Sequence, residues 1–151
     1  MLLYARLIGS RTIDELPRWA RELVDAARVA RLAFVDDREH PRILPVTFAV
    51  AEGAVWSAVD DKPKRSREPA RLRYLQRRPE AALCVDRYDD DWSRLAWVQL
   101  LGTITIHDID DAPAALAALT ARYAPYRERR PPGPLLCLEP ARAVCWRAVE
   151  R

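Results

Sequence analysis

The feature that most constrains the fold is a regular two-residue period between residues 96 and 107. Small and apolar residues occupy one set of alternate positions: Ala96, Val98, Leu100, Gly102, Ile104 and Ile106. The other set is Trp97, Gln99, Leu101, Thr103, Thr105 and His107. A period of two is that of a β-strand, whose successive side chains point to opposite sides of a sheet. We therefore expect a long strand over residues 95–107 with one face in the core.

Shorter segments with the same period flank this one. We predict strands over residues 29–35, 43–51, 54–59 and 81–85, and a sixth over 135–138 and 143–149 on either side of Pro140. The turn Glu52-Gly53 would join two of them in a hairpin. Helical spacing predicts helices over 12–28 and 111–123, and a basic loop with a short helix over 61–78. The proline-rich stretch 124–134 is predicted to be a loop.

This order of elements indicates an α+β domain that is mainly β, with an antiparallel sheet forming a small barrel. The 151 residues, half of them hydrophobic, suffice for one core, so we expect a single domain over 1–151. No apolar run approaches the ~20 residues of a membrane helix, and the start of the chain has no signal-peptide cleavage site. We therefore expect a cytoplasmic protein that does not bind a membrane.

Several kinds of site are disfavoured by composition. The four glycines are scattered, which excludes glycine-rich phosphate loops, and a GxSxG nucleophile motif is missing. Three cysteines without a CxxC pair and two distant histidines do not assemble a zinc site, so we predict no metal. Four aspartates between residues 86 and 91 have the chemistry to bind metal or shuttle protons, but such hairpin loops are more often only solvated.

The strongest chemical signal is a basic segment from residue 62 to 78. It holds eight cations and one acid, Glu68. Both lysines of the chain lie in this segment, whereas the 23 arginines are spread over the whole chain. Pro69 suits the first turn of a helix. Cations just before a helix N-terminus favour an anion such as phosphate. A solvated basic face is the bland alternative. Nucleic acid is a rival that we disfavour, because the stretch is short and the net charge is only +3.

Two strands offer surfaces for a planar ligand. In residues 43–51, small side chains at Pro45, Thr47 and Ala49 share a face with Ile43, and such a face can lie against a ring. In residues 95–107, Trp97 and then Gln99 could pack on a ring and hydrogen-bond its edge. An exposed face or one covered by a second subunit would explain both patterns equally well.

The motifs resemble a known family. Residues 29–35, 41–46 and 57–65, the last including VDDKPKR, resemble the flavin-binding split barrel of the pyridoxamine 5′-phosphate oxidase class. The segment VDRYDDDWSRLAWVQLLG, residues 85–102, is similar to a subgroup of probable oxidoreductases that use coenzyme F-420, an 8-hydroxy-5-deazaflavin. The resemblance covers residues 26–108, over half of the chain.

This resemblance implies a six-stranded antiparallel split β-barrel with flanking helices, working as a homodimer with a cofactor in each cleft between subunits. Lys62, Lys64 and Arg65 would contact the cofactor phosphate, supported by Ser57. The ring would lie along Pro45, Val46 and Thr47, bordered by Trp97 and Gln99 of the same chain or of its partner. The chain departs from the family at Gln99, where arginine is frequent, and at Glu39, where a turn glycine is common.

The function that the resemblance implies is hydride transfer from reduced F-420 to an unsaturated small organic substrate. The cofactor supplies the chemistry and the protein binds and orients it. No catalytic residue can be named from the sequence, although water or Tyr88 would be a source of the proton. The alternatives are an FMN-dependent enzyme of the same fold and a protein that binds F-420 without turnover.

Overall fold

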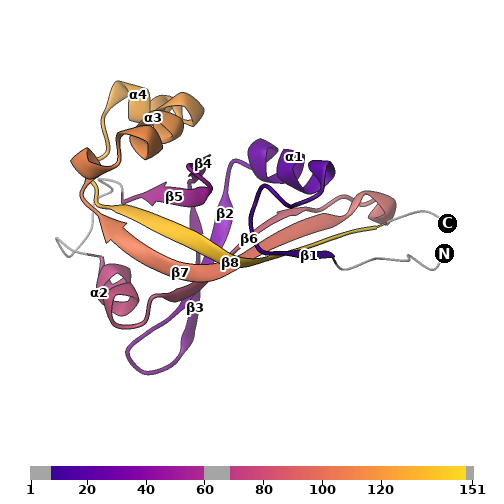
Figure 1. Ribbon diagram of the computed structural model, residues 1–151, viewed down its shortest axis with the longest axis horizontal. Helices are drawn as coiled ribbons and strands as arrows, with labels where there is room; N and C mark the ends of the chain where they lie inside the picture. Colours follow the sequence, from indigo (N-terminus) through magenta and orange to yellow (C-terminus); the bar gives the residue numbers. More distant parts are fainter. Residues whose placement is uncertain (1–7, 60–68, 149–151) are drawn as a thin grey trace.

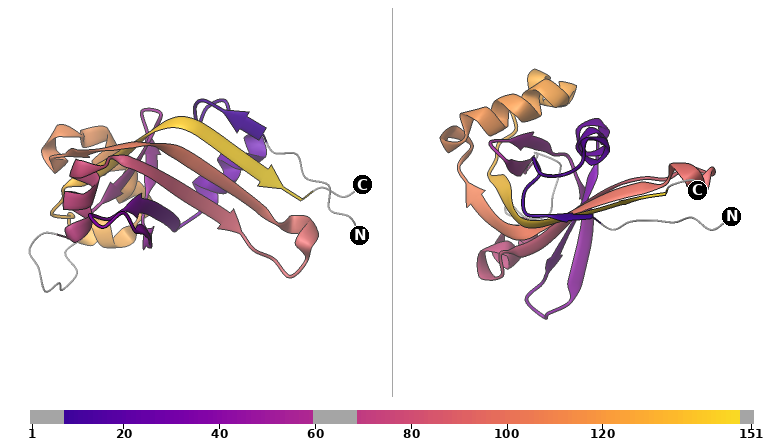
Figure 2. Two further views of the ribbon diagram at one scale, coloured as in Figure 1. Left: turned by 90° about the horizontal axis from the view of Figure 1, so that it is seen from below. Right: turned by 45° about the vertical axis from the view of Figure 1, so that its right-hand side comes forward.

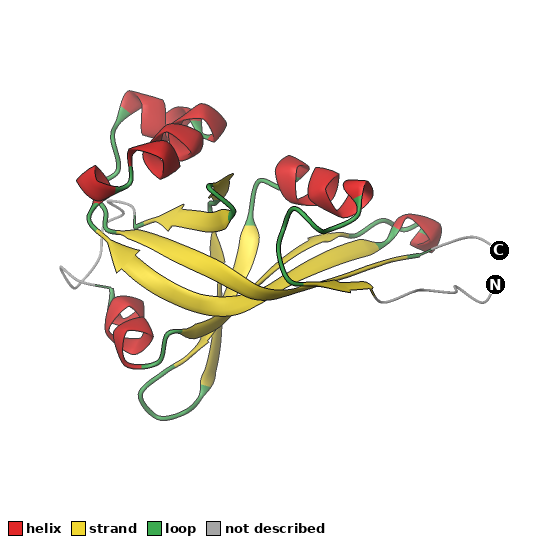
Figure 3. Ribbon diagram, viewed as in Figure 1, coloured by secondary structure: helices red, strands yellow, loops and turns green. Residues whose placement is uncertain are grey.

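The computed structural model describes residues 8–59 and 69–148 (Figure 1). Its strands are β1 (Ile8–Ser10), β2 (Ala30–Val35), β3 (Pro41–Val46), β4 (Ala49–Ala51), β5 (Ala54–Ala58), β6 (Glu80–Arg87), β7 (Ala96–His107) and β8 (Leu135–Arg147). The helices are α1 (Arg18–Ala26), α2 (Ala70–Arg77), α3 (Pro113–Arg122) and α4 (Ala124–Glu128), with 3₁₀ turns η1 (Trp92–Arg94) and η2 (Ile109–Asp111). Figure 3 shows the helices arranged around a single twisted sheet.

The strands pair antiparallel in the order β3-β2-β6-β7-β8-β5-β4, with β1 added to β8. The prediction of six strands is wrong, because the sheet of the described residues has eight. The predicted barrel is also wrong, because this sheet does not close on itself. One extra strand is β1, which pairs with β8 through Ile8 and Cys145. The other arises because the expected strand over residues 43–51 is divided into β3 and β4.

The division falls at Thr47 and Phe48, which two tyrosines hold outside the strand ladder. The Phe48 amide donates to the Tyr123 hydroxyl at 2.9 Å, and the Thr47 hydroxyl lies 2.8 Å from the hydroxyl of Tyr126. A buried backbone amide needs a partner, and here the side chain of Tyr123, between α3 and α4, supplies it in place of a neighbouring strand. The chain therefore turns between β3 and β4 without leaving the Phe48 amide unpaired.

The two-residue period of β7 produces the predicted burial. Ala96, Val98, Leu100 and Ile104 are at most 4% exposed and belong to the main core, together with Leu23 and Val24 of α1. A second, smaller core lies where α3 packs against β4 and β5. Ala49, expected on the open face with Pro45, is instead buried in this second core at 1% exposure. Figure 2 shows the β2–β3 hairpin extending away from α1, α3 and α4.

The helices differ from the predictions at their starts. The expected helix over residues 12–28 is shorter in the structure: the Glu15 amide donates to the Thr12 hydroxyl at 3.3 Å, but α1 begins only at Arg18. Pro17 precedes it with an extended ψ of 151°, and a proline also keeps the residue before it out of the helical region. Pro69 similarly precedes α2 instead of being its first residue. The predicted loop over 124–134 contains the short helix α4.

A β-bulge lets β7 and β8 run side by side over their whole length. The pairing shifts between Leu101, opposite Arg142, and Gly102, opposite Pro140. A Cβ atom on Gly102 would lie 1.9 Å from the carbonyl oxygen of Glu139. Glycine is needed here because the two backbones approach too closely for any side chain. The predicted break at Pro140 is thus a bulge inside one continuous strand. Among the residues described, no helix is long and apolar enough to span a membrane.

Candidate functional site

The segment predicted to lie along a ring, residues 45–47, ends the edge strand β3. Pro45 is exposed, Val46 is 8% exposed and directed into the core, and Thr47 is half-buried. Within the described part of the chain, β3 pairs only with β2. One edge of its backbone therefore has N–H and C=O groups that no neighbouring strand uses.

Tyrosines from the C-terminal half fix the end of this segment. The Tyr123 hydroxyl accepts from the Phe48 amide and lies 2.8 Å from the Phe48 carbonyl oxygen and 3.0 Å from that of Arg28. Tyr126 contacts Thr47 directly, and its ring meets that of Tyr123 edge-on at 5.7 Å. Since Tyr123 is only 8% exposed, these bonds are made in a largely dry environment, which strengthens them.

Trp97 and Gln99 lie on the face of β7 that points away from the core. Gln99 pairs with Cys84 of β6, Cys84 with Arg31 of β2, and Arg31 with Pro45 of β3. These four residues form one row on the same face of the sheet. Three strand spacings separate Gln99 from Pro45, about 14 Å. Within one chain, the two parts of the predicted ring site therefore share a face without touching.

This outer face mixes apolar and charged side chains, because the exposed Arg31 lies in the row between Pro45 and Cys84 and pairs with Asp86 at 3.1 Å. Ile43 is 68% exposed, and its row continues through Ala33, Ala82 and Leu101, all half-buried. The rings of Trp97 and Trp146 stack nearby at 6.5 Å with 11° between their planes. Ile43 and the two stacked tryptophans form the apolar part of this face, and apolar groups gathered on a surface are found at binding or subunit-contact regions. We define the outer sheet face by Ile43, Pro45, Leu101, Trp97 and Gln99.

Ser57 lies on the opposite, inner side of the sheet. It is 7% exposed in β5, opposite Leu136, and it lines a cavity of about 10 Å³ with apolar side chains. A cavity of this size holds at most one water molecule. Lys62, Lys64 and Arg65 lie outside the described residues, so the predicted phosphate contacts of these three and of Ser57 stay predictions.

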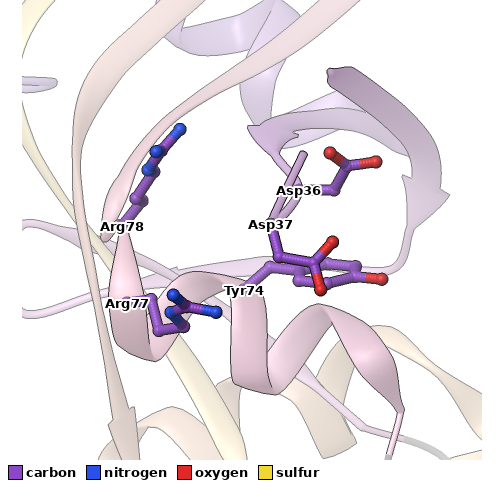
Figure 4. A pocket seen from close by; sticks show the side chains of 5 residues that line it. All are labelled: Asp36, Asp37, Tyr74, Arg77 and Arg78. Carbon is purple, nitrogen blue, oxygen red and sulfur yellow. The ribbon is translucent and has the colours of Figure 1, made fainter. Parts of the chain in front are cut away.

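The described part of the basic segment packs against the β2–β3 turn. Figure 4 shows a pocket of about 160 Å³ between Asp36 and Asp37 of the turn and Tyr74, Arg77 and Arg78 of α2 and its end. Two further contacts join the elements: Arg78 to Glu39 at 3.0 Å and Arg73 to Asp37 at 4.0 Å. Part of the positive charge is thus used to hold the turn.

The turn itself is organised by two acidic residues. The Asp36 carboxylate accepts from the amides of His40 and Arg38, both at 2.9 Å, and these bonds hold its pKa below the ordinary value. Glu39 has a φ of 66°, in the left-handed region that favours glycine. The position where the family commonly has a glycine is therefore a left-handed turn position in this chain as well.

The aspartate-rich loop is structural where its contacts are described. Asp91 accepts from the amide and the hydroxyl of Ser93 at 3.1 and 2.7 Å, which lowers its pKa, and Asp89 pairs with Arg94 at 3.0 Å. These bonds cap η1 at the end of the β6–β7 hairpin. Over residues 8–59 and 69–148, no three His, Cys, Asp or Glu side chains gather closely enough to hold a metal ion.

Sequence reasoning placed Tyr123 on a helix face and assigned Tyr126 to a loop, and it attached no function to either. The signal that was available is the hydroxyl itself, because a tyrosine at the buried end of an otherwise apolar helix usually bonds to something. Its partners, Thr47 and Phe48, are more than 70 residues away and could not be named from the sequence.

A family comparison agrees with this architecture. The model of the pyridoxamine 5′-phosphate oxidase family matches residues 18–142, which is most of the chain. This chain belongs to the pyridoxamine 5′-phosphate oxidase family. No curated protein sequence matches it. The membership confirms the resemblance at the level of the family and does not reach the F-420 subgroup.

Solved structures of the same fold bind different groups. A FAD-binding protein from Mesorhizobium loti is 15% identical with a TM-score of 0.72, and the match covers 98% of this chain and 99% of that one. A heme-binding protein from Mycobacterium smegmatis is 22% identical with a TM-score of 0.64. That match covers 80% of this chain, which spans 49% of the length of that protein. The heme storage protein from Vibrio cholerae is 12% identical with a TM-score of 0.61, over 80% of this chain and 86% of that one. Identities this low show the fold alone.

Proposed function

We propose that this chain is an oxidoreductase of the family that binds the deazaflavin F-420 in a groove between two copies of itself. The observation that carries the proposal is the row from Pro45 to Gln99 on the outer sheet face. Its two ends are too far apart to border one ring within a chain. A second copy laid on this face would bring its own Trp97 and Gln99 over residues 45–47.

The residues at this place fit a flavin-like ring. The pyrimidine edge of such a ring presents carbonyl and N–H groups in alternation, and the free backbone edge of β3 offers the complementary groups. Pro45 is small and exposed, so the ring could approach the backbone closely. The tyrosine contacts at Thr47 and Phe48 hold the segment still, which reduces the entropy that binding would cost.

The acidic end of the cofactor would lie at the basic segment. Lys62, Lys64 and Arg65 would hold the phosphate, with Ser57 in support, and the remaining cations of the basic segment suit the glutamate carboxylates of the F-420 tail. FMN carries one phosphate and no such carboxylates, so it needs fewer cations. This surplus of positive charge is the reason for preferring F-420, with FMN as the second candidate supported by the FAD-binding structural neighbour.

When bound, the cofactor supplies the hydride. The protein would orient the ring through residues 45–47, shield one ring face with the sheet, and leave the other face to an unsaturated small organic substrate. Water would supply the proton, because Tyr88, which follows β6, lines a cavity between α1 and the β6–β7 hairpin and not the outer sheet face.

Cofactor titrations followed by fluorescence, with F-420 and FMN measured separately, test the identity of the ligand. We expect F-420 to bind more tightly, and oxidation of reduced F-420 by a panel of quinones and other unsaturated acceptors to require the protein. Tight binding of FMN without binding of F-420 would show that the protein is an FMN-dependent enzyme of the same fold. Binding of F-420 without oxidation of the reduced cofactor by any acceptor would show that the protein binds F-420 but does not catalyse hydride transfer.

Light scattering on the purified chain tests the groove. Ile43→Arg places a charge in the centre of the outer sheet face and is expected to yield monomers that bind F-420 at least about tenfold more weakly. Ala117→Arg, at an exposed position of α3, is the matched control and should remain dimeric. A wild-type chain that is monomeric at all concentrations while binding F-420 normally would refute the intersubunit groove.

A further inference from the structure

A cavity larger than the two described above lies away from the outer sheet face. It occupies about 710 Å³ between α1 and the end of the β6–β7 hairpin, and we call it the α1 groove. Trp19, Leu23 and Ala26 of α1 form one wall, and Arg87, Ala96 and Arg147 lie along the sheet on the other side. This volume is in the range of small-molecule sites, and its walls combine apolar surface with a few charged groups, as such sites do.

The floor of the α1 groove is built by strand register. Arg87 of β6 pairs with Ala96 of β7, and Ala96 pairs with Arg147 of β8, so the three residues form one row. Residues directly opposite in neighbouring strands point to the same side of the sheet. Two arginines thus flank an alanine, about 10 Å apart at their Cα atoms. The short side chain of Ala96 leaves space that both guanidinium groups can reach.

The two carboxylates that line the groove, Glu22 and Asp86, each form an ion pair with an arginine that does not line it. Glu22 lies 2.7 Å from Arg18, and Asp86 lies 3.1 Å from Arg31. These two pairs leave the arginines of the floor as the charges that decide what the groove attracts.

The arginines themselves have no such compensation. The Nε of Arg87 donates to the backbone carbonyl of Arg94 at 2.8 Å, which fixes the side chain and leaves its charge. Arg147 lies over the Trp19 ring at 5.1 Å and has no carboxylate partner among the described residues. Arg87 and Arg147 therefore place two positive charges, without a carboxylate partner in residues 8–59 and 69–148, beside the apolar wall of the α1 groove.

We propose that the α1 groove binds an amphipathic carboxylate, a small molecule with one carboxylate on an apolar body. The carboxylate would lie over Ala96 and accept hydrogen bonds from Arg147 and Arg87, because guanidinium groups match the geometry of carboxylate oxygens. The apolar body would lie along Trp19 and Leu23.

This site is distinct from the proposed cofactor site. Ala96 alternates with Trp97 along β7, so the α1 groove and the outer sheet face lie on opposite sides of the same strand. Binding in the groove needs neither F-420 nor a second copy of the chain. The proposal therefore stands or fails independently of the proposed function.

Calorimetric titration of the cofactor-free protein with octanoate, and with 1-octanol as the uncharged counterpart, tests the proposal. We expect octanoate to bind and 1-octanol to bind at least about tenfold more weakly, because the alcohol forms no charged hydrogen bond. Arg147→Gln should weaken octanoate binding by about tenfold or more, whereas Arg147→Lys, which keeps the charge, should lose less.

Arg21→Gln is the matched control, because Arg21 is an exposed arginine of α1 that does not line the groove. It should bind octanoate like the wild type. If Arg147→Gln does not fold, the comparison of octanoate with 1-octanol on the wild type still decides. Equal affinity for the two, unchanged binding by a folded Arg147→Gln, or no octanoate binding at millimolar concentration would each overturn the proposal.

Discussion

Replacing Tyr123 by phenylalanine removes one hydroxyl from the junction of β3, β4 and α3. That hydroxyl accepts from the Phe48 amide at 2.9 Å and lies within 3.0 Å of two backbone carbonyl oxygens, those of Phe48 and Arg28. Phenylalanine fills the same space, so the packing of the ring is retained. The substitution therefore isolates the hydrogen bonds from the hydrophobic contribution of the side chain.

The expected loss follows from what is left unpaired. The Phe48 amide is buried and loses its acceptor, and one carbonyl loses its donor, since a hydroxyl has a single proton. Each buried group without a partner costs about 1–3 kcal/mol, so for the two groups we expect a destabilisation of roughly 2–6 kcal/mol. For a domain of this size that corresponds to a fall in Tm of about 4–24 °C.

Urea unfolding followed by tryptophan fluorescence measures this loss, and Tyr88→Phe is the control, because Tyr88 is 71% exposed. Tyr123→Phe should also weaken F-420 binding, since Thr47 and Phe48 would no longer be held in place. A destabilisation within about 0.5 kcal/mol of the control would refute the assignment of Tyr123 as the anchor of this segment.

Three further predictions concern other parts of the chain. Gly102→Ala should cost about 3 kcal/mol in urea unfolding, because its Cβ would meet a carbonyl oxygen at 1.9 Å, whereas Gly9→Ala, with its nearest atom at 3.9 Å, should change little; equal effects would contradict the bulge. The pKa of Asp36 is lowered by hydrogen bonds in the folded state, so its contribution to stability is present at neutral pH and is lost as the pH falls below about 4. The difference in urea midpoint between wild type and Asp36→Asn should therefore shrink from pH 7 to pH 3, and a constant difference would argue against this role. Burial raises the pKa of the Cys137 thiol to about 11, so at pH 8 it should resist Ellman's reagent until the protein unfolds, and rapid native labelling of Cys137 would contradict its placement.

The parts of the fold that follow from local pattern were predictable. The alternation from Ala96 to Ile104 gave the correct core face of β7, because side-chain direction in a strand depends only on position. The exposure of Ile43 and Pro45 follows in the same way. The sequence alone therefore predicts that Trp97 lies on the outer face. It does not predict which residues of the neighbouring strands lie beside Trp97.

The parts that depend on distant contacts were not predictable. The break at Thr47 is caused by Tyr126, and nothing near Thr47 in the chain signals it. Ala49 was expected on the open face and is buried because α3 covers it. The row that links Pro45 to Gln99 depends on the register of β2 against β6, which the sequence does not state.

The place of β8 in the sheet has a consequence for how the chain acquires its structure. Although β8 is the last strand described, it lies between β7 and β5, and within residues 8–59 and 69–148 the strand β5 pairs with β8 and β4 alone. A two-stranded hairpin is marginal alone in water. During synthesis, β4 and β5 can therefore join the rest of the sheet only after residues 135–138 of β8 have left the ribosome. Folding is expected to be completed only after nearly the whole chain has been synthesised, and a chain that stops before β8 should be recognised as unfolded by cellular proteases.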